Sequence, residues 1–527
     1  MYDFIIKNGQ VADGESDSLI KADVAVNGDT IVAVAPDMEP DNAVRIIDAD
    51  GKIVAPGFVD VHSHSDYYLI IDPRAESKIM QGVTTEIGGN CGYCAAPMSG
   101  ALRDRRAADY EKQFGIKVDW ADLESYFTAL GAKGHAVNFA ALLGYNTIRG
   151  SALGENSNQP DADGMKKLRE MTARGLDQGA LGMSVGVVYP PACFAGQEEF
   201  TEVFKVVADR GKVFTSHIRS EGAGLLDALK EVVAVAKNSG SKLQVSHLKT
   251  AGADNWGKLD AAFDILESAM ADGVSLMADR YPYLASNTGL QVVLPDRAFD
   301  DGRAKLVERL KDKGSREAFK REILKAHPEK KYWDTVMVSQ VGADKNKDIE
   351  GLTVSEGADK RGKDVFDFVF DLLVEENTDV EAIFFCMNED NLDRIMAKPW
   401  ITIGSDSGAR AIDGPLAIGR PHPRTFGTFP RFFAEFVREK KLFTIGQAVK
   451  KTSSDALNFF GVSQRGYIKE GFFADIVVFD PATIGDTSTY IAPLSYPAGI
   501  EHVFVNGSHA VENGAPRGLT GGRVIRR

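Results

Sequence analysis

The first indication of the fold is one strand-like segment, Val54-Ala55-Pro56-Gly57-Phe58-Val59-Asp60-Val61-His62-Ser63-His64. Successive side chains of a strand point to opposite faces, so His62 and His64 lie on the same face and both can reach one cation. Taken alone, such a pair also fits core or surface histidines with no metal. The apolar run before it and Asp66 after it make the pattern more specific.

Four more segments repeat this arrangement of an apolar run followed by a residue that can bind zinc or move a proton. They are Gly88-Gly89-Asn90-Cys91, Thr215-Ser216-His217, Val245-Ser246-His247 and Gly404-Ser405-Asp406. If the strands lie parallel in one barrel, all these side chains meet at its C-terminal rim. The sequence therefore predicts a metal site at that rim.

The order of apolar runs and helical patterns predicts an α/β fold, a (β/α)8 TIM-like barrel. The expected barrel strands are Val54–Val61, Thr84–Gly88, Ala136–Ala141, Gly182–Val185, Val213–Ser216, Leu243–Ser246, Val274–Ala278 and Trp400–Gly404. A charged region with helical patterns precedes the last strand, so we expect an insertion at about 290–350. The barrel should then occupy residues 55–462.

Both ends of the chain contain short segments in which apolar and polar residues tend to alternate, and turns separate these segments. Examples are Asp23-Val24-Ala25-Val26 and Ala474-Asp475-Ile476-Val477-Val478-Phe479. This sequence pattern is typical of antiparallel strands. We therefore expect residues 1–54 and 463–527 to form one small β-sandwich domain beside the barrel.

Composition limits the function classes. The 527 residues carry 61 basic and 75 acidic side chains, a formal net charge of −14, which argues against a nucleic-acid-binding surface. There is neither a signal-like N-terminus nor an apolar run of about 18 residues, which predicts a cytoplasmic enzyme without a membrane span. The four cysteines are too few to crosslink a chain of this size.

Each candidate residue also has a simpler interpretation. Single histidines such as His217 and His247 are more often structural than metal-binding, and a lone Cys91 fits a buried inert thiol. Cys91 and Cys94 have a Cys-x-x-Cys spacing, but without a second pair or a thioredoxin-like context a redox site is disfavoured. Asp406 can be a general base, a metal ligand or a helix N-cap.

The succession of these residues resembles the amidohydrolase superfamily, and cysteine in Gly89-Asn90-Cys91-Gly92 resembles the D-aminoacylases, the N-acyl-D-amino-acid deacylases. Further similar motifs are Gly179-Ala180-Leu181-Gly182-Met183-Ser184, Tyr189-Pro190-Pro191, Ser246-His247-Leu248-Lys249, Tyr281-Pro282-Tyr283 and His422-Pro423-Arg424-Thr425-Phe426-Gly427. The resemblance covers nearly the whole chain. Hydantoinases and dihydroorotases are similar in order but use a carbamylated lysine as bridging ligand.

The resemblance implies a zinc-dependent hydrolase of the amide bond in N-acyl-D-amino acids. Its ligands for a tightly bound zinc are Cys91, His217 and His247, and a weaker second position lies among His62, His64 and Asp406. Asp406 is the implied catalytic residue, which takes a proton from water and passes it to the departing amine.

The resemblance also implies a substrate site for a small N-acyl-D-amino acid. Lys249, Tyr281 and Asn287 match positions that bind the substrate α-carboxylate, and Tyr189 lies in a shared motif of the pocket. Similar enzymes commonly have serine in place of Asn287, although an amide can also donate a hydrogen bond.

Substrate preference is read from Leu294-Pro295-Asp296-Arg297, where similar enzymes with aliphatic preference carry an apolar or aromatic residue instead of arginine. Arg297 could bind the side-chain carboxylate of N-acyl-D-glutamate, or it could be a surface arginine paired with Asp296 or Asp300. Two other classes stay open, a cyclic-amide or dipeptide hydrolase on the same scaffold and a non-catalytic scaffold protein.

Overall fold

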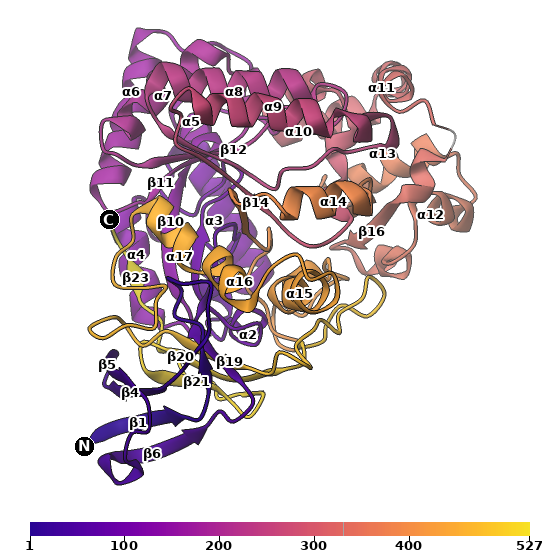
Figure 1. Ribbon diagram of the computed structural model, residues 1–527. Coiled ribbons are helices and arrows are strands. Elements are labelled where there is room, and N and C mark those ends of the chain that lie inside the picture. The colour runs from indigo at the N-terminus through magenta and orange to yellow at the C-terminus, as the bar shows by residue number, and fades with distance from the viewer. Residues whose placement is uncertain (330) are drawn as a thin grey trace.

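The computed structural model describes residues 1–329 and 331–527. Eight parallel strands form a barrel in which each strand pairs with the next, so the predicted fold class is confirmed (Figure 1). These strands are β8 (Phe58–Asp60), β9 (Val83–Gly88), β10 (Asn138–Gly144), β11 (Gly182–Gly186), β12 (Val213–His217), β13 (Lys242–Val245), β14 (Leu276–Arg280) and β18 (Ile401–Ile403). The first and last strands meet just beyond their C-terminal ends, where Asp406 N–H donates to the His62 carbonyl over 2.8 Å.

Helices cover the outside of the barrel because each carries an apolar stripe that needs burial. In α8, for example, Leu225, Leu229, Val232 and Ala236 are buried, and Gly240 ends the helix in a left-handed conformation at φ 76°. The helices around the barrel are α1 (Tyr68–Ile71), α2 (Glu76–Ile79), α3 (Gly100–Phe114), α4 (Leu123–Lys133), α5 (Tyr145–Leu153), α6 (Ala162–Asp177), α7 (Gln197–Ala208), α8 (Leu225–Ser239), α9 (Leu259–Ala271), α14 (Glu389–Met396), α15 (Arg424–Arg431), α16 (Ile445–Thr452) and α17 (Ser454–Phe460).

The first expected strand is divided in the structure. Residues Ile53–Pro56 form β7, which pairs with the C-terminal strand β19 (Ile476–Phe479), and the barrel strand begins only at Phe58. The break falls at Gly57, whose N–H donates to the Asp475 carbonyl over 2.9 Å. A side chain at Gly57 would lie 2.1 Å from Thr84 Cγ2, so only glycine fits where the chain passes between the two sheets.

Both ends of the chain build two sheets beside the barrel, as the sequence predicted. One sheet has the order β5-β4-β1-β6 and the other β22-β21-β20-β19-β7-β2-β3. Their further strands are β1 (Tyr2–Lys7), β2 (Gln10–Val11), β3 (Ile20–Lys21), β4 (Asp23–Asn27), β5 (Thr30–Ala35), β6 (Ala43–Asp48), β20 (Ile500–Val505), β21 (Ser508–Glu512) and β22 (Ala515–Pro516). The rings of Phe4 and Phe504 stack at 4.6 Å in the shared core. The last strand, β23 (Val524–Ile525), returns to pair with β10.

A separate lobe stands between β14 and β18, to the right in Figure 1. It holds the antiparallel sheet β15-β17-β16 and has its own apolar core, which runs from Leu290 to Ala382. Its elements are β15 (Ala285–Gly289), α10 (Gly302–Lys311), α11 (Lys313–Ala326), β16 (Val336–Gln340), α12 (Val354–Arg361), α13 (Val365–Glu375) and β17 (Glu381–Phe385). The lobe therefore continues beyond residue 350, because β17 is the central strand of its sheet.

Among the described residues, no helix has both the length and the apolar character needed to cross a membrane.

Candidate metal centre

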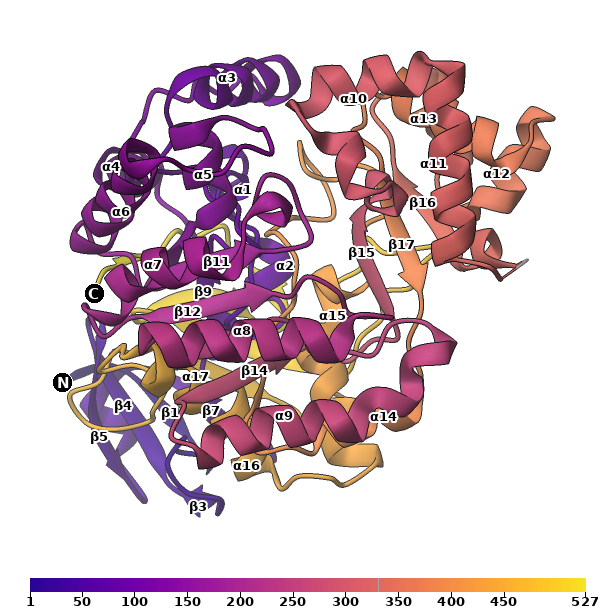
Figure 2. The same cartoon turned by 90° about the horizontal axis from the view of Figure 1, so that it is seen from above.

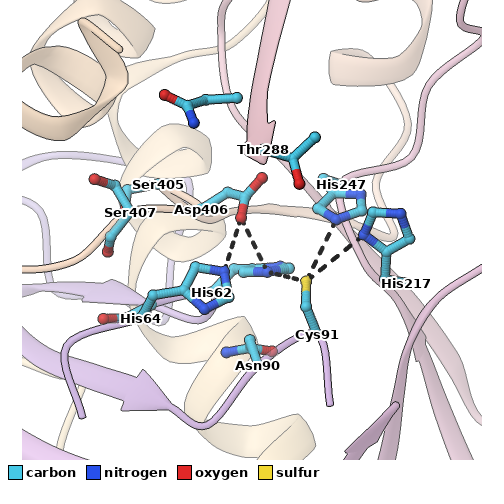
Figure 3. A network of polar contacts seen from close by, with 12 residues as sticks. His62, His64, Asn90, Cys91, His217, His247, Thr288, Ser405, Asp406 and Ser407 are labelled. Carbon is cyan, nitrogen blue, oxygen red and sulfur yellow. Dashed lines mark hydrogen bonds and ion pairs between the residues drawn. The ribbon is translucent and has the colours of Figure 1, made fainter. Parts of the chain in front are cut away.

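The C-terminal ends of five barrel strands bring the predicted metal-binding side chains together (Figure 3). His62 and His64 follow β8, Cys91 follows β9, and His217 is the last residue of β12. His247 and Asp406 follow β13 and β18. The side chains meet because parallel strands all end at the same rim of the barrel.

Cys91 lies at the centre of this cluster. Its Sγ is 3.2 Å from His62 Nε2, 3.7 Å from His217 Nδ1 and 3.6 Å from His247 Nε2. Burial raises the pKa of the thiol, but the positive charge of His62 and the hydrogen bonds from the three imidazoles outweigh it and hold the Cys91 pKa well below its usual value. The site therefore favours a thiolate, the form that binds metals.

Asp406 joins the second part of the cluster. Its Oδ1 lies 3.0 Å from His64 Nε2 and 3.4 Å from His62 Nε2, and its Oδ2 lies 2.8 Å from Arg424 Nη1. Although burial acts in the opposite direction, the charges of Arg424 and His62 hold the pKa of Asp406 well below its usual value. Asp406 is thus kept as a carboxylate in a buried site.

The donor atoms form two overlapping groups that share Cys91. One group is His62, His64, Cys91 and Asp406, and the other is Cys91, His217 and His247, with the donor atoms of each group within 4.8 Å of one another. Imidazole nitrogen, thiolate sulfur and carboxylate oxygen are the ligands that zinc takes in proteins. The residues present therefore fit one zinc ion or a pair.

Three of these residues have positive φ angles, namely Cys91 at 50°, His247 at 35° and Asp406 at 51°. Left-handed backbone is unfavourable for residues other than glycine, and it concentrates at functional sites. The flanking glycines ease the turn at Cys91, because side chains at Gly89 and Gly92 would collide with Leu142 and Asn146.

Two carboxylates that the sequence analysis did not assign orient the histidines. Asp279 Oδ1 lies 3.0 Å from His62 Nδ1 and accepts the His247 N–H at 2.9 Å. Glu221 Oε1 lies 2.9 Å from His247 Nδ1 and also contacts Lys249. Asp279 follows the expected strand Val274–Ala278 just as Asp406 follows the last one, so the same pattern could have identified it.

Arg424 is a third residue to which the sequence analysis gave no role. It is buried, its guanidinium binds Asp406, and its Nη2 donates to the Asn287 carbonyl over 3.3 Å. It belongs to the motif His422-Pro423-Arg424, which the resemblance includes.

The cluster opens into a cavity of about 1760 Å³ between the barrel rim and the lobe. His64, Cys91, His217, His247 and Asp406 line it. The predicted substrate residues Lys249, Asn287 and Tyr189 line it as well. Asn287 Nδ2 donates to Glu381 over 2.7 Å, and Tyr189 Oη lies 2.9 Å from Thr288 Oγ1.

Tyr281 is fully buried behind this wall. Its ring centroid is 4.2 Å from the Arg280 guanidinium, 4.6 Å from the Arg424 guanidinium and 6.0 Å from Lys249 Nζ. Its hydroxyl has no hydrogen-bond partner among the described residues.

The structure does not bring Arg297 into the cavity. Residues Asp296–Phe299 form a 3-10 turn that places Asp296 in the cavity wall and turns Arg297 outward. The Arg297 side chain is 53% exposed, pairs with Glu322 and lies over the ring of Phe319. The alternative of a surface arginine matches this placement, with Glu322 as partner in place of Asp296 or Asp300.

Comparison with known proteins places these features in context. The sequence model that describes the amidohydrolase family matches residues 45–319 and 363–509 of this chain. The chain is 34% identical, over its full length and 96% of the relative, to N-acyl-D-glutamate deacylase of Alcaligenes xylosoxydans xylosoxydans. It is 33% identical, over its full length and 98% of the relative, to D-aminoacylase of the same organism.

A solved structure is similar over the whole of both chains. It is N-acyl-D-glutamate deacylase from Bordetella bronchiseptica, complexed with zinc and a phosphonate inhibitor that mimics the tetrahedral intermediate of the reaction. The TM-score is 0.83 and the sequence identity is 32%.

Proposed function

The chain belongs to the amidohydrolase family, and from this premise we propose that it hydrolyses the amide bond of N-acyl-D-amino acids, with zinc as its cofactor, to a carboxylate and a free D-amino acid. The observation that carries the proposal is the position of Cys91, which lies within 3.7 Å of three imidazole nitrogens and belongs to both groups of donor atoms. Deacylases of N-acyl-D-amino acids are also the relatives that match the full chain.

Six residues would hold the metal. Cys91, His217 and His247 would hold a tightly bound zinc, and His62, His64, Asp406 and the shared Cys91 would hold a second, more weakly bound ion. A bound zinc ion supplies Lewis-acid polarisation of the amide carbonyl and lowers the pKa of water.

Asp406 is the proposed proton carrier. Its carboxylate lies at the cavity wall, and Arg424 holds Oδ2 while Oδ1 faces His62 and His64. It would accept a proton from the attacking water and donate it to the leaving nitrogen, which must be protonated before the amine departs. Arg424 fixes the direction in which the carboxylate points.

Lys249 and Tyr281 are the proposed partners of the substrate α-carboxylate. Lys249 lines the cavity and carries a positive charge, which it shares with Glu221. The Tyr281 hydroxyl, buried behind the cavity wall, has no hydrogen-bond partner among the described residues. Asn287 has one amide hydrogen engaged by Glu381 and keeps a second for the substrate. Tyr189 completes the wall, with its ring 4.9 Å from that of His217.

The other two function classes fit less well. A hydantoinase-like site needs a carbamylated lysine as bridging ligand, whereas here the Cys91 thiol belongs to both groups of donor atoms. A non-catalytic scaffold would not need the complete set of donors, Asp406 among them, or a buried Tyr281 hydroxyl that no described residue engages.

The direct experiment is a substrate screen. Purified protein is offered N-acetyl and N-formyl amino acids of both chiralities, with added zinc and with a chelator, and free amino acid is measured. The proposal expects zinc-dependent release of D-amino acids. Release of L-amino acids only, full activity without metal, or hydrolysis of hydantoins alone would contradict it.

A further inference from the structure

The cavity is larger than an N-acetyl amino acid requires. Pockets for small ligands usually enclose about 300–1,000 Å³, whereas this cavity encloses about 1760 Å³. Its walls beyond the metal centre therefore offer positions for a further group on the substrate, and the charges on those walls indicate which group.

The lobe forms one wall, and that wall is acidic. Its cavity-lining carboxylates are Asp296, Glu329, Glu375, Glu376, Asp379 and Glu381, and they outnumber the two cations of the lobe that line the cavity, Arg303 and Lys331. A negatively charged group on the substrate would be repelled from this side.

Helix α3 forms the opposite wall, and that wall is basic. In Figure 2 the end of α3 lies near α10 of the lobe, and Arg303 of α10 approaches Asp109 of α3 at 3.9 Å. The neighbouring residues Arg105 and Arg106 of α3 both line the cavity. Arg105 is neutralised, because its guanidinium forms a bidentate pair with Glu155.

Arg106 differs from Arg105. It is partly buried, and in the described part of the chain no hydrogen-bond acceptor or carboxylate contacts its guanidinium.

The other partly or fully buried cations of the cavity have partners: Arg219 binds Glu231, Lys249 binds Glu221, Arg303 approaches Asp109, Arg410 donates to two carbonyls, and Arg424 binds Asp406. Lys112 and Lys331 are exposed.

Aromatic rings connect Arg106 with the metal centre. The hydroxyl groups of Tyr67, Tyr93 and Tyr110 are close enough to influence the guanidinium, as is the Glu155 carboxylate, which is paired with Arg105. The Tyr93 ring lies 5.9 Å from that of Tyr189, which in turn lies 4.9 Å from that of His217. A substrate held at the metal centre can therefore extend along this aromatic wall toward Arg106.

We propose that Arg106 binds a second carboxylate of the substrate, so that the enzyme prefers N-acyl-D-amino acids that carry two negative charges. This inference rests on the proposed deacylase function and assigns its substrate class. An unpaired guanidinium in a cavity is suited to bidentate binding of a carboxylate. The second carboxylate can belong to the amino-acid side chain or to the acyl group, and the chemistry at Arg106 is the same.

The test compares Arg106→Gln with Arg105→Gln, a matched control that removes the same charge from the adjacent, already paired position. Four substrates are used: N-acetyl-D-glutamate and its neutral analogue N-acetyl-D-glutamine, and N-succinyl-D-leucine with neutral N-acetyl-D-leucine. Wild-type enzyme should have the higher kcat/KM for at least one diacid, and which diacid it is identifies the source of the carboxylate.

Arg106→Gln should raise KM for that diacid roughly 10- to 100-fold, as expected for a lost charge-assisted hydrogen bond, with kcat and the neutral substrates changed less than about twofold. Arg105→Gln should leave the acid-to-neutral ratio unchanged, and Arg106→Lys should restore part of it. An unchanged ratio in an active Arg106→Gln enzyme overturns the inference.

Calorimetric binding separates this inference from the proposed function. If wild-type enzyme hydrolyses none of the four substrates, the deacylase proposal fails. Weaker binding of the diacids than of the neutral analogues to wild-type protein, or equal binding of the diacids to wild-type protein and Arg106→Gln, overturns the role of Arg106 whether or not turnover is seen.

Discussion

Asp279 Oδ1 lies 3.0 Å from His62 Nδ1, and both side chains are fully buried. The contact occupies one ring nitrogen of His62 and directs the other, Nε2, toward Cys91 and Asp406. The same carboxylate oxygen accepts the backbone N–H of His247 at 2.9 Å, where φ is 35°. One carboxylate therefore fixes a ring orientation and an unfavourable backbone turn in the same cluster.

Asp279→Asn should weaken zinc binding by roughly 10- to 100-fold, the usual effect of losing a carboxylate behind a histidine ligand. The amide keeps the size of the side chain but not its charge, so His62 loses the partner that selects its tautomer. The measurement is a zinc competition titration against a chelator of known affinity. Wild-type affinity in a folded Asp279→Asn protein would show that this contact does not orient a ligand.

Asp406→Asn should retain zinc at the Cys91, His217 and His247 position but lose most of its turnover. An amide cannot accept the proton from water, and such proton transfer contributes about 10²- to 10⁴-fold to rate. Zinc content by atomic absorption and kcat are measured on the same preparation. Near wild-type kcat with full zinc content would remove Asp406 from the proton-transfer role.

Arg297→Ala should leave the ratio of kcat/KM for N-acetyl-D-glutamate and N-acetyl-D-leucine unchanged. The Arg297 guanidinium faces solvent and Glu322, whereas Asp296 faces the cavity, so the Arg297 side chain does not reach the bound substrate. A loss of stability below about 1 kcal/mol is expected from the exposed ion pair. A selective loss of the D-glutamate substrate would instead mean that Arg297 reaches the bound substrate.

The sequence was sufficient to predict the barrel and the convergence of the proposed metal-binding residues, since those signals are local. Each barrel strand is a short apolar run, and the side chain that follows it must lie at the shared rim. His217 and Asp406 are examples, although they are 189 residues apart in the sequence. Parallel pairing turns that sequence distance into proximity.

The parts that could not be predicted depend on distant partners. The outward direction of Arg297 depends on a 3-10 turn and on Glu322. The continuation of the lobe to Phe385 depends on β17 pairing with both β15 and β16. The break at Gly57 depends on Thr84 and Asp475, neither of which is visible from the apolar run Val54–Val61 itself.

Lys78→Met should destabilise the protein by about 3–5 kcal/mol, because it leaves buried carboxylates without their cation. Lys78 Nζ is 2.7 Å from Asp60 and 3.4 Å from Glu86, and all three side chains are fully buried. Lys78 also donates to Ser405 Oγ over 2.9 Å, and Ser405 precedes Asp406 in the chain. We therefore expect a lower kcat in the folded fraction of the Lys78→Met variant.

The control is Lys237→Met, which removes an ion pair of the same 2.7 Å length between side chains that are 41% and 63% exposed. That change should cost less than about 1 kcal/mol, since solvent screens the exposed pair. The free energy of unfolding is measured for both variants by denaturant titration of the metal-free and the zinc-loaded protein. Equal losses in the two variants would mean that the buried Lys78 network contributes no more to stability than a surface pair.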